Sequence, residues 1–252
     1  MKILSALGEE EGEDILGPEV PYLSAIGALM YLAINTRPDI AFSVNLLARY
    51  SSEPTNRHWS GVKHLLRYIR GTTDMGLFYP RDGNPTLVGH ADAGYLSDPV
   101  KAKSQIGYIF SYGNTAISWK STKQTLTATS SNQAELIALY EAGRECVWLR
   151  SLTHHILKES GIKETQEGPT IIHEDNTACI AQIKEGYIKG DRTKHIDPKF
   201  FSTHDLEKEG TINVTQVQSC NNLADLLTKV LPAKQFQELV HLTGLRRLRD
   251  IR

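Results

Sequence analysis

The chain has 252 residues, of which 40% are hydrophobic and 23% are charged. This composition excludes collagen-like, disulfide-scaffold and disordered classes, and the length allows one large domain or one domain with a smaller attachment. The formal net charge of −1 is unusual for a protein that holds a polyanion. However, residues 1–20 contain one lysine and six acidic residues, so the rest of the chain carries +4. We expect residues 1–17 to form an acidic, disordered tail on a mildly basic body.

The cysteines and the N-terminal segments together predict a protein that is neither secreted nor embedded in a membrane. The three cysteines are far apart and form no CxxC pair, which is typical of reduced thiols in the cytoplasm or nucleus. The apolar stretch at the N-terminus is too short for a signal peptide. Residues 20–36 are uncharged, but Leu23, Ile26, Met30 and Ala33 recur at helical spacing. This segment therefore predicts a buried amphipathic helix and no membrane partner.

Residues 18–79 have a helical pattern in three pieces. The first covers residues 21–35, and Pro38 opens the second, because proline is tolerated in the first turn of a helix. The third runs from Thr55 to a stop at Gly71. These pieces predict a small helical bundle without a catalytic constellation. A turn-rich linker at residues 80–85 follows.

The region after this linker alternates between strand and helix patterns. Residues 87–92, 104–111 and 115–121 predict strands, the last two joined as a hairpin by the turn at residues 112–114. A long helix is expected at 132–157, a strand at 170–172 and a helix from Asn176. A further helix should end near Lys208, before a strand at 211–217 and helices from Asn222 onward. The pattern predicts an α/β fold.

Four carboxylates stand where this layout would expose them: Asp92 at a strand end, Glu135 in the first turn of the long helix, Asp175 after a short strand, and Asp225 early in a helix. Taken singly, Glu135, Asp175 and Asp225 have a bland interpretation as helix caps or favourable charges near a helix N-terminus. Taken together, carboxylates that converge from separate elements are the ligands that two hard divalent cations need for phosphodiester chemistry. Spacing alone leaves both interpretations open.

Seven ordered strings add a specific resemblance. They are YLAINTRPDI at 31–40, AISWK at 116–120, SSNQAEL at 130–136, WLR at 148–150, EDN at 174–176, RTKHID at 192–197 and ADLLTK at 224–229. These strings resemble the C-terminal part of copia-type retrotransposon Pol polyproteins, and the likeness runs from about residue 17 to residue 245. The order of the four carboxylates resembles that in ribonuclease H domains.

The resemblance implies a ribonuclease H-like fold, a five-stranded mixed sheet flanked by helices and preceded by a small helical bundle. Residues 86–230 would be the ribonuclease H domain, residues 18–79 a remnant of the reverse transcriptase thumb or connection, and residues 231–252 a C-terminal helix and basic tail. The implied activity is cleavage of the RNA strand of RNA–DNA hybrids with two Mg²⁺ ions, for which Mn²⁺ could substitute. The polymerase active site is absent, because no YxDD motif occurs upstream.

The resemblance also implies roles for individual residues. Asp92, Glu135 and Asp175 would be the core metal ligands and Asp225 the fourth, with Asp92 and Asp175 shared between ions, Glu135 on one ion and Asp225 on the other. The expected contacts to nucleic acid are Asn132, Gln133, Asn176, Arg192, Lys194 and His195. The implied partners are the hybrid and the polymerase part of a reverse transcriptase, in a cytoplasmic virus-like particle or the nucleus. The sequence makes no prediction of oligomeric state.

Three departures from the family pattern are visible. Tyr95 follows Asp92 where tryptophan is usual, the loop before Asp225 has no histidine, and the segment after Asp197 differs. None removes an expected ligand. Two rival hypotheses remain: a catalytically inactive relic that binds nucleic acid or is purely structural, and a DNA strand transferase on the same fold. The early position of Glu135 in its helix argues against the transferase.

Overall fold

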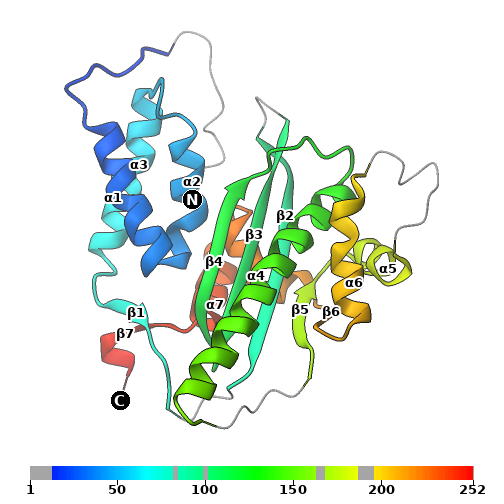
Figure 1. The fold of residues 1–252 in the computed structure, drawn as a ribbon. Helices are drawn as coiled ribbons and strands as arrows, with labels where there is room; N and C mark the ends of the chain where they lie inside the picture. The colour runs from blue at the N-terminus through cyan, green and yellow to red at the C-terminus, as the bar shows by residue number, and fades with distance from the viewer. Residues whose placement is uncertain (1–12, 82–84, 99–101, 163–167, 187–195, 252) are drawn as a thin grey trace.

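A five-stranded mixed sheet forms the centre of the protein, as seen in Figure 1. The computed structural model describes residues 13–81, 85–98, 102–162, 168–186 and 196–251. The strand order is β4-β3-β2-β5-β6, in which β2, β3 and β4 are antiparallel neighbours while β5 runs parallel to both β2 and β6. The strands are β2 (Leu87–Asp98), β3 (Lys103–Tyr112), β4 (Thr115–Lys123), β5 (Thr170–Glu174) and β6 (Ile212–Gln216). The expected five-stranded mixed sheet is confirmed.

The hairpin between β3 and β4 has the turn that its sequence predicts. Tyr112 pairs with Thr115, and the two residues between them, Gly113 and Asn114, have φ angles of +61° and +64°. Two consecutive residues with positive φ form the turn that matches the twist of a tight hairpin, and glycine and asparagine tolerate this conformation best.

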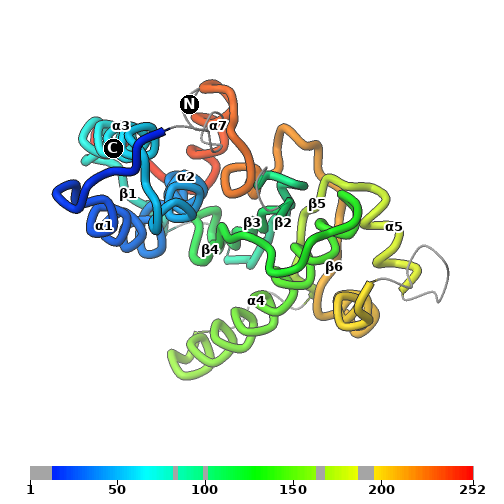
Figure 2. Tube along the Cα trace, turned by 90° about the horizontal axis from the view of Figure 1, so that it is seen from above, coloured from blue at the N-terminus to red at the C-terminus, as the bar shows by residue number. Residues whose placement is uncertain are grey.

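One face of the sheet packs against the long helix α4 (Ser131–Glu159). Figure 2 shows α4 crossing beneath the strands. The core on this side joins residues of β2 and β3, such as Ala91 and Phe110, to Leu136 and Leu139 of α4. The remaining helices near this face are α5 (Thr177–Glu185), the 3₁₀ helix η3 (Pro198–Phe201) and α6 (Ser202–Lys208).

The other face, toward the β4 edge, carries a second core that includes the N-terminal bundle. It joins Ile109 and Ala116 of the sheet to the helices, including Leu29 of α1 and Leu47 of α2. The indole nitrogen of Trp119 on β4 also donates to the carbonyl oxygen of Ala33 at 2.7 Å. The bundle consists of α1 (Tyr22–Asn35), η2 (Pro38–Ile40), α2 (Ala41–Ala48) and α3 (Asn56–Arg70). Its three predicted helices are therefore confirmed and packed on the sheet.

The C-terminal segment shares the core of the bundle. It forms the 3₁₀ helices η4 (Ser219–Asn221) and η5 (Leu223–Leu227), α7 (Ala233–Leu242), β7 (Leu245–Arg247) and the 3₁₀ helix η6 (Leu248–Asp250). Strand β7 pairs with β1 (Met75–Leu77), a two-stranded sheet that the sequence did not predict. Arg246 and Arg247, expected in a basic tail, therefore lie in a strand. Both strands have only three residues, too few to show an alternating pattern.

Part of the expected acidic tail is attached to the bundle. The backbone amide of Leu16 donates to the carbonyl oxygen of Pro54 at 2.8 Å, and Glu13 forms a 3.1 Å ion pair with Arg57. Residues 13–16 thus lie against the entrance to α3. Residues 1–12 lie outside the described part of the chain.

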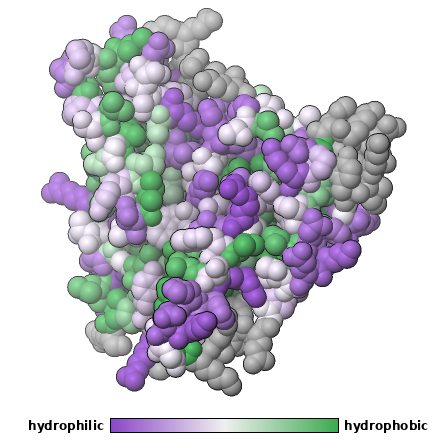
Figure 3. All heavy atoms as spheres, in the orientation of Figure 1, coloured by the Kyte–Doolittle hydropathy of each residue, from purple (hydrophilic) through white to green (hydrophobic). Residues whose placement is uncertain are grey.

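The outer surface of the bundle is partly apolar. Leu23, Tyr31 and Ile34 of α1 are all more than 60% exposed, and Figure 3 shows hydrophobic residues at the surface over this bundle. The inner face of α1 buries Tyr22, Ile26, Leu29 and Ala33, as the helical spacing predicts. Among the described residues, no helix is long and apolar enough to cross a membrane.

A buried ion pair fixes the junction between α1 and η2. The guanidinium of Arg37 donates to both carboxylate oxygens of Asp39, at 2.9 and 2.7 Å, and the Tyr68 hydroxyl donates to Asp39 at 2.7 Å. Arg37 also donates to the carbonyl oxygen of Thr72 beyond α3. Arg37 and Asp39 are 6% and 4% exposed. Loss of either charge would leave the other without its buried counter-ion.

Replacing Asp39 with asparagine should therefore lower the free energy of unfolding by about 3–5 kcal/mol, the usual cost of breaking a buried ion pair. Urea unfolding followed by circular dichroism measures this loss. The matched control is the exposed pair Lys234–Glu238 on α7, whose nitrogen and oxygen are 3.9 Å apart. Glu238→Gln should cost less than about 1 kcal/mol. Equal effects of the two substitutions would contradict a structural role for the buried pair.

Candidate active site

Asp92 lies in the middle of β2 and points away from α4. Its neighbours Ala91 and Ala93 belong to the core beneath α4, so alternation along the strand directs Asp92 to the opposite face. There it is only 1% exposed. It accepts a hydrogen bond from the Thr228 hydroxyl, and its other oxygen is 3.1 Å from the ammonium of Lys229.

Asp225 reaches the same place from η5. The helix expected from Asn222 is present and takes the 3₁₀ form, with Asp225 as its third residue. Asn222 caps its first turn by accepting from the amide of Ala224, and also donates to the carbonyl oxygen of Ala91 at 2.8 Å. The amide of Asp225 donates to the carbonyl oxygen of Asn222, three residues back. The side chain of Asn222 thus anchors η5 beside the strand that carries Asp92.

Glycine in the sheet allows η5 to approach closely. A Cβ atom on Gly107, which pairs with Asp92 across β2 and β3, would lie 2.6 Å from Cγ2 of Thr228. A Cβ atom on Gly94 would lie 2.7 Å from the carbonyl oxygen of Thr228. Both separations are below van der Waals contact, so side chains at these positions would push η5 and Asp225 away from Asp92.

Glu135 lies in the first turns of α4, whose start is well capped. Ser130 is the N-cap and accepts from the amide of Gln133 at 3.1 Å, while the Gln133 side chain accepts from the amide and hydroxyl of Thr129, both at 2.7 Å. Ser130 thus satisfies one free amide of the first turn of α4, and Gln133 satisfies the amide of the residue just before the cap. These hydrogen bonds hold Glu135 in place with 6% of its surface exposed.

Asp175 follows β5 directly, and the residue before it contributes a further carboxylate. Ile172 and Glu174 are buried on the α4 side of β5, as alternation from Ile172 predicts. One oxygen of Glu174 accepts from the amide of Asn176 at 3.1 Å. Asp175 is partly buried at the end of the strand. Sequence interpretation missed Glu174, although its strand alternation with Ile172 was a usable signal.

The five carboxylates form two groups that share Asp175. One group contains Asp92, Asp175 and Asp225, and the other contains Glu135, Glu174 and Asp175; within each, one oxygen per residue lies within 4.8 Å of the others. The structure therefore brings together all four carboxylates that the sequence singled out. Asp175 is common to both groups, whereas Asp92, also expected to be shared, belongs to one.

Burial and mutual repulsion raise the pKa values of these groups. Burial, reinforced by the neighbouring charge of Glu174, raises the pKa of Glu135 to about 11. Burial also raises the pKa of Glu174 well above its usual value. Burial and the nearby Asp92 raise the pKa of Asp225 to about 6, although Lys229 opposes this. The pKa of Asp92 is likewise raised by burial, against the effect of Lys229. Removing water from like charges favours their protonated forms.

The residues fit a divalent cation on two observations. Every potential ligand atom in the two groups is a carboxylate oxygen, the donor that hard cations such as Mg²⁺ prefer. In addition, one oxygen each of Glu135 and Glu174 is buried without a hydrogen-bond partner. Buried polar atoms are normally satisfied, so these two oxygens lack a partner that a cation would supply.

The expected nucleic-acid contacts have different settings. Asn132 is partly buried and donates to the side chain of Gln182, and Asn176 caps α5 by accepting from the amide of Cys179. Gln133 is 6% exposed and its oxygen accepts from the amide and hydroxyl of Thr129. Arg192, Lys194 and His195 lie outside the described residues. All six remain predictions, and Gln133 is the least available of the three described.

Thr228 and Lys229 were missed as site residues. Both belong to the ADLLTK string, and Lys229 stands four residues after Asp225, a spacing that brings side chains together in a helical turn. Its ammonium is 2.8 Å from Asp225 as well as 3.1 Å from Asp92. Burial lowers the pKa of Lys229, but the two carboxylates outweigh this and raise it above its usual value.

A cavity of about 480 Å³ lies elsewhere, between α3 and α7. Tyr68 and Phe236 are on its walls, and none of the five carboxylates lines it. The cavity is therefore separate from the chemistry expected of the carboxylates.

In metal chelator, Glu135→Gln should stabilise the protein at alkaline pH. Because the folded-state pKa of Glu135 is about 11 and the ordinary value is 4.5, the folded state binds more protons between these limits and loses stability as pH rises. Glutamine removes this loss, so the free energy of unfolding of the variant should exceed that of the native chain at pH 8–9 and should fall less steeply with rising pH.

Urea unfolding from pH 5 to pH 9 in chelator measures this effect. The control is Glu159→Gln at the exposed end of the same helix, which should leave the pH profile unchanged. A native chain whose stability is flat or rises over this range would contradict a buried, protonated Glu135.

Comparison with known proteins relates this chain to the polyproteins of mobile elements. The Pol polyprotein of transposon TNT 1-94 from Nicotiana tabacum is 36% identical over 227 residues, which is 90% of this chain and 16% of the polyprotein. The polyprotein of transposon RE2 from Arabidopsis thaliana is 34% identical over 88% of this chain and 15% of its own length. The chain thus spans about one sixth of these relatives. Secreted RxLR effector protein 161 of Plasmopara viticola is 45% identical over 130 residues, 52% of this chain and 92% of the effector.

Solved structures give weaker likenesses. The ribonuclease H1 LC11 from compost has a TM-score of 0.38 at 16% identity and covers 62% of this chain and 99% of its own. A foamy viral protease-reverse transcriptase in complex with an RNA/DNA hybrid has a TM-score of 0.48 at 11% identity, over 84% of this chain and 26% of that one. No protein-family model matches the chain. The polyprotein relatives match along nearly the whole chain, and the chain is therefore related to one segment of the copia-type retrotransposon Pol polyproteins.

Proposed function

We propose that this chain is a ribonuclease H that hydrolyses the RNA strand of RNA–DNA hybrids with two Mg²⁺ ions, for which Mn²⁺ can substitute. One observation carries the proposal: Asp92, Glu135, Asp175 and Asp225 come from β2, α4, the end of β5 and η5, yet form two adjoining groups of carboxylates. Helix capping explains such residues singly but gives no reason for their convergence. The relationship to retrotransposon polyproteins supports the same activity.

The two groups suit a two-ion site because they share a ligand. Asp92 and Asp225 with Asp175 would hold one ion, and Glu135 and Glu174 with Asp175 the other. When bound, two such ions activate a water molecule and stabilise the charge on the attacking and leaving oxygens of a phosphodiester. The protein's own contribution is to fix Asp92 through Thr228, and η5 through Asn222. The products would be a 3′-hydroxyl and a 5′-phosphate.

Recognition of the hybrid would use the polar residues beside these groups. Asn132 lies in the first turn of α4, three residues before Glu135, and Asn176 follows Asp175. Either amide could contact the 2′-hydroxyl by which a protein distinguishes RNA from DNA. Contacts to the phosphates would come from Arg192, Lys194 and His195. The polymerase part of a reverse transcriptase would add further contacts to the hybrid. The reaction would take place in a cytoplasmic virus-like particle or in the nucleus.

A second candidate function is a module that binds hybrid without cutting it. The observation that favours it is Lys229, whose ammonium forms ion pairs with both Asp92 and Asp225. If this lysine does not yield to a cation, the two-ion arrangement cannot form. Such a chain would bind hybrid and show no cleavage.

Asp175→Asn should abolish cleavage of a labelled RNA–DNA hybrid in Mg²⁺, because Asp175 is common to both carboxylate groups. The loss should be about 10³-fold or more, since removing a single group that stabilises the transition state already costs about 10²–10³. Asparagine has nearly the same volume as aspartate, so the variant should fold. Circular dichroism checks that the variant and the native chain have equal folded content. Glu159→Gln, far along α4, is the control that should retain full activity.

Three outcomes are distinct. Cleavage that needs Mg²⁺ and is lost in the Asp175→Asn variant supports the nuclease. Hybrid binding without cleavage by the native chain favours the non-catalytic module. Cleavage that survives in the variant would contradict the proposed site.

A further inference from the structure

Lys229 stands at one of the two carboxylate groups and not at the other. Its ammonium is 3.1 Å from Asp92 and 2.8 Å from Asp225, which are two of the three members of one group. Among the described residues, its ion pairs are with these two carboxylates, and neither Glu135 nor Glu174 pairs with it. The positive charge of the lysine is therefore placed asymmetrically.

The second group has the opposite character. Glu135 and Glu174, 6% and 0% exposed, each present a buried oxygen without a hydrogen-bond partner; Oδ1 of Asp225 in the first group also has no hydrogen bond, but the ammonium of Lys229 lies 2.8 Å from it. No lysine or arginine in the described parts of the chain forms an ion pair with either residue. A lysine thus balances part of the charge of one carboxylate group by direct ion pairs, while Glu135 and Glu174 of the other group have no such pair among the described residues.

We propose that Lys229 is a built-in competitor for one of the two cation positions, so that in the absence of nucleic acid the chain binds one divalent ion readily and a second only when the lysine is displaced. This rests on the proposed function only insofar as the carboxylates are cation ligands. An ammonium within 3.1 Å of both Asp92 and Asp225 occupies the region where a cation held by these oxygens must lie. Two positive charges that close repel each other strongly.

The position of Lys229 allows it to leave without disturbing the core. The side chain of Lys229 is 36% exposed, whereas the side chains of Asp92 and Asp225 are 1% and 3% exposed. A lysine ammonium is a mobile point charge on a flexible stem, so it can move into solvent or toward a phosphate of bound nucleic acid. Asp92 would keep its hydrogen bond from Thr228 when this happens. Lys229 is in this sense a positioning residue that orders the loading of the two ions.

Titration of the purified chain with Mn²⁺, with free Mn²⁺ followed by electron paramagnetic resonance and no nucleic acid present, tests the proposal. The native chain should bind one ion, with a second at least about tenfold weaker. Lys229→Met removes the competing charge and should bind two ions of comparable affinity. Lys229→Arg keeps a cation and should behave like the native chain.

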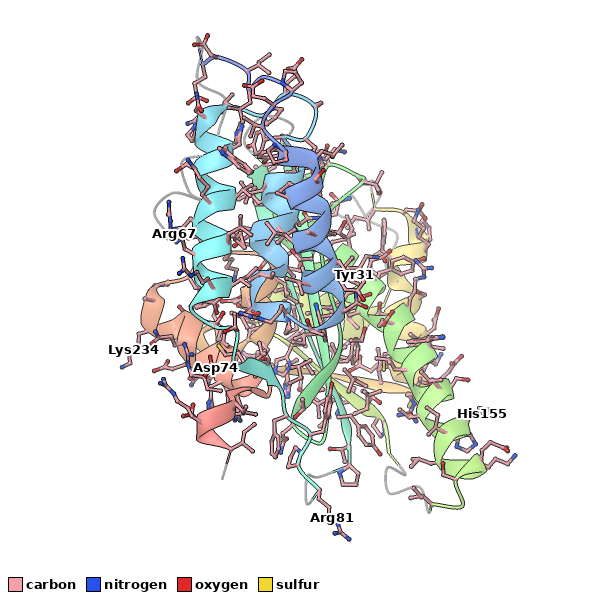
Figure 4. All side chains as sticks on the ribbon, turned by 90° about the vertical axis from the view of Figure 1, so that its left-hand side faces the viewer. Tyr31, Arg67, Asp74, Arg81, His155 and Lys234 are labelled. Carbon is pink, nitrogen blue, oxygen red and sulfur yellow. The ribbon has the colours of Figure 1, made fainter. Side chains whose placement is uncertain are left out.

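The matched control is Lys234→Met, which removes one positive charge from α7, where Figure 4 shows Lys234 on the outer surface. Its side chain is 90% exposed, and it should reproduce native binding. Lys229→Gln, a second neutral variant, replaces the methionine variant if that one does not fold.

The proposal is overturned if the native chain binds two ions of equal affinity, or if both neutral variants keep the native stoichiometry and affinities. A hybrid cleavage assay on the same preparations separates this result from the proposed activity. A chain that shows the expected contrast in Mn²⁺ binding but cuts no hybrid would refute the nuclease and leave the role of Lys229 standing. A chain that cuts hybrid but binds Mn²⁺ equally in its native and neutral-variant forms would support the nuclease and refute the role of Lys229.

Discussion

The structure depends on the cost of holding five carboxylates together with little water. Asp92, Glu135, Glu174 and Asp225 are all at most 6% exposed, and Asp175 joins them at the end of β5. Negative charges at this separation and burial are unfavourable unless a proton or a cation balances them. The protein supplies one cation, Lys229, at Asp92 and Asp225. Glu135 and Glu174 must take up protons, as their raised pKa values indicate, or a metal ion.

The remainder of the fold keeps these groups in place. Parallel pairing of β2 with β5 brings Asp92 and Asp175 to neighbouring strands although 82 residues separate them in the chain. The capped start of α4 fixes Glu135 on one face of the sheet, and Asn222 fixes η5 on the other. Behind η5, its residues Leu223, Leu226 and Leu227 join the core of the N-terminal bundle and α7. The bundle therefore supports the site from behind, although it contributes none of the five carboxylates.

Much of this arrangement could be predicted from local sequence, and the failures have physical causes. Periodicity located the helices of the bundle and α4, because an amphipathic pattern extends over many residues. It gave no warning of β1 and β7, whose three-residue strands form by pairing across the whole chain. The convergence of the carboxylates followed from the family resemblance, since spacing alone could not distinguish it from helix capping.

Among the individual site residues, too, some could be predicted from local sequence and others could not. Glu174 stands beside Asp175, which follows the strand and has the more familiar position for a ligand, but strand alternation with the apolar Ile172 indicates the orientation of Glu174. The position of η5 beside β2 is fixed by the hydrogen bond from Asn222 to Ala91, a contact between residues 131 apart that no local pattern encodes. The same holds for Lys229, whose spacing suggests Asp225 as a partner but gives no hint of Asp92.

The most direct test of the central claim is a crystal structure of the chain soaked in Mn²⁺, with the ions located by anomalous scattering. Balancing of the buried carboxylates by divalent cations predicts an anomalous peak among Glu135, Glu174 and Asp175, and a weaker or absent peak among Asp92, Asp175 and Asp225 while Lys229 stays in place. No peak at either group, at a Mn²⁺ concentration that saturates binding in solution, would contradict a cation site built from these residues.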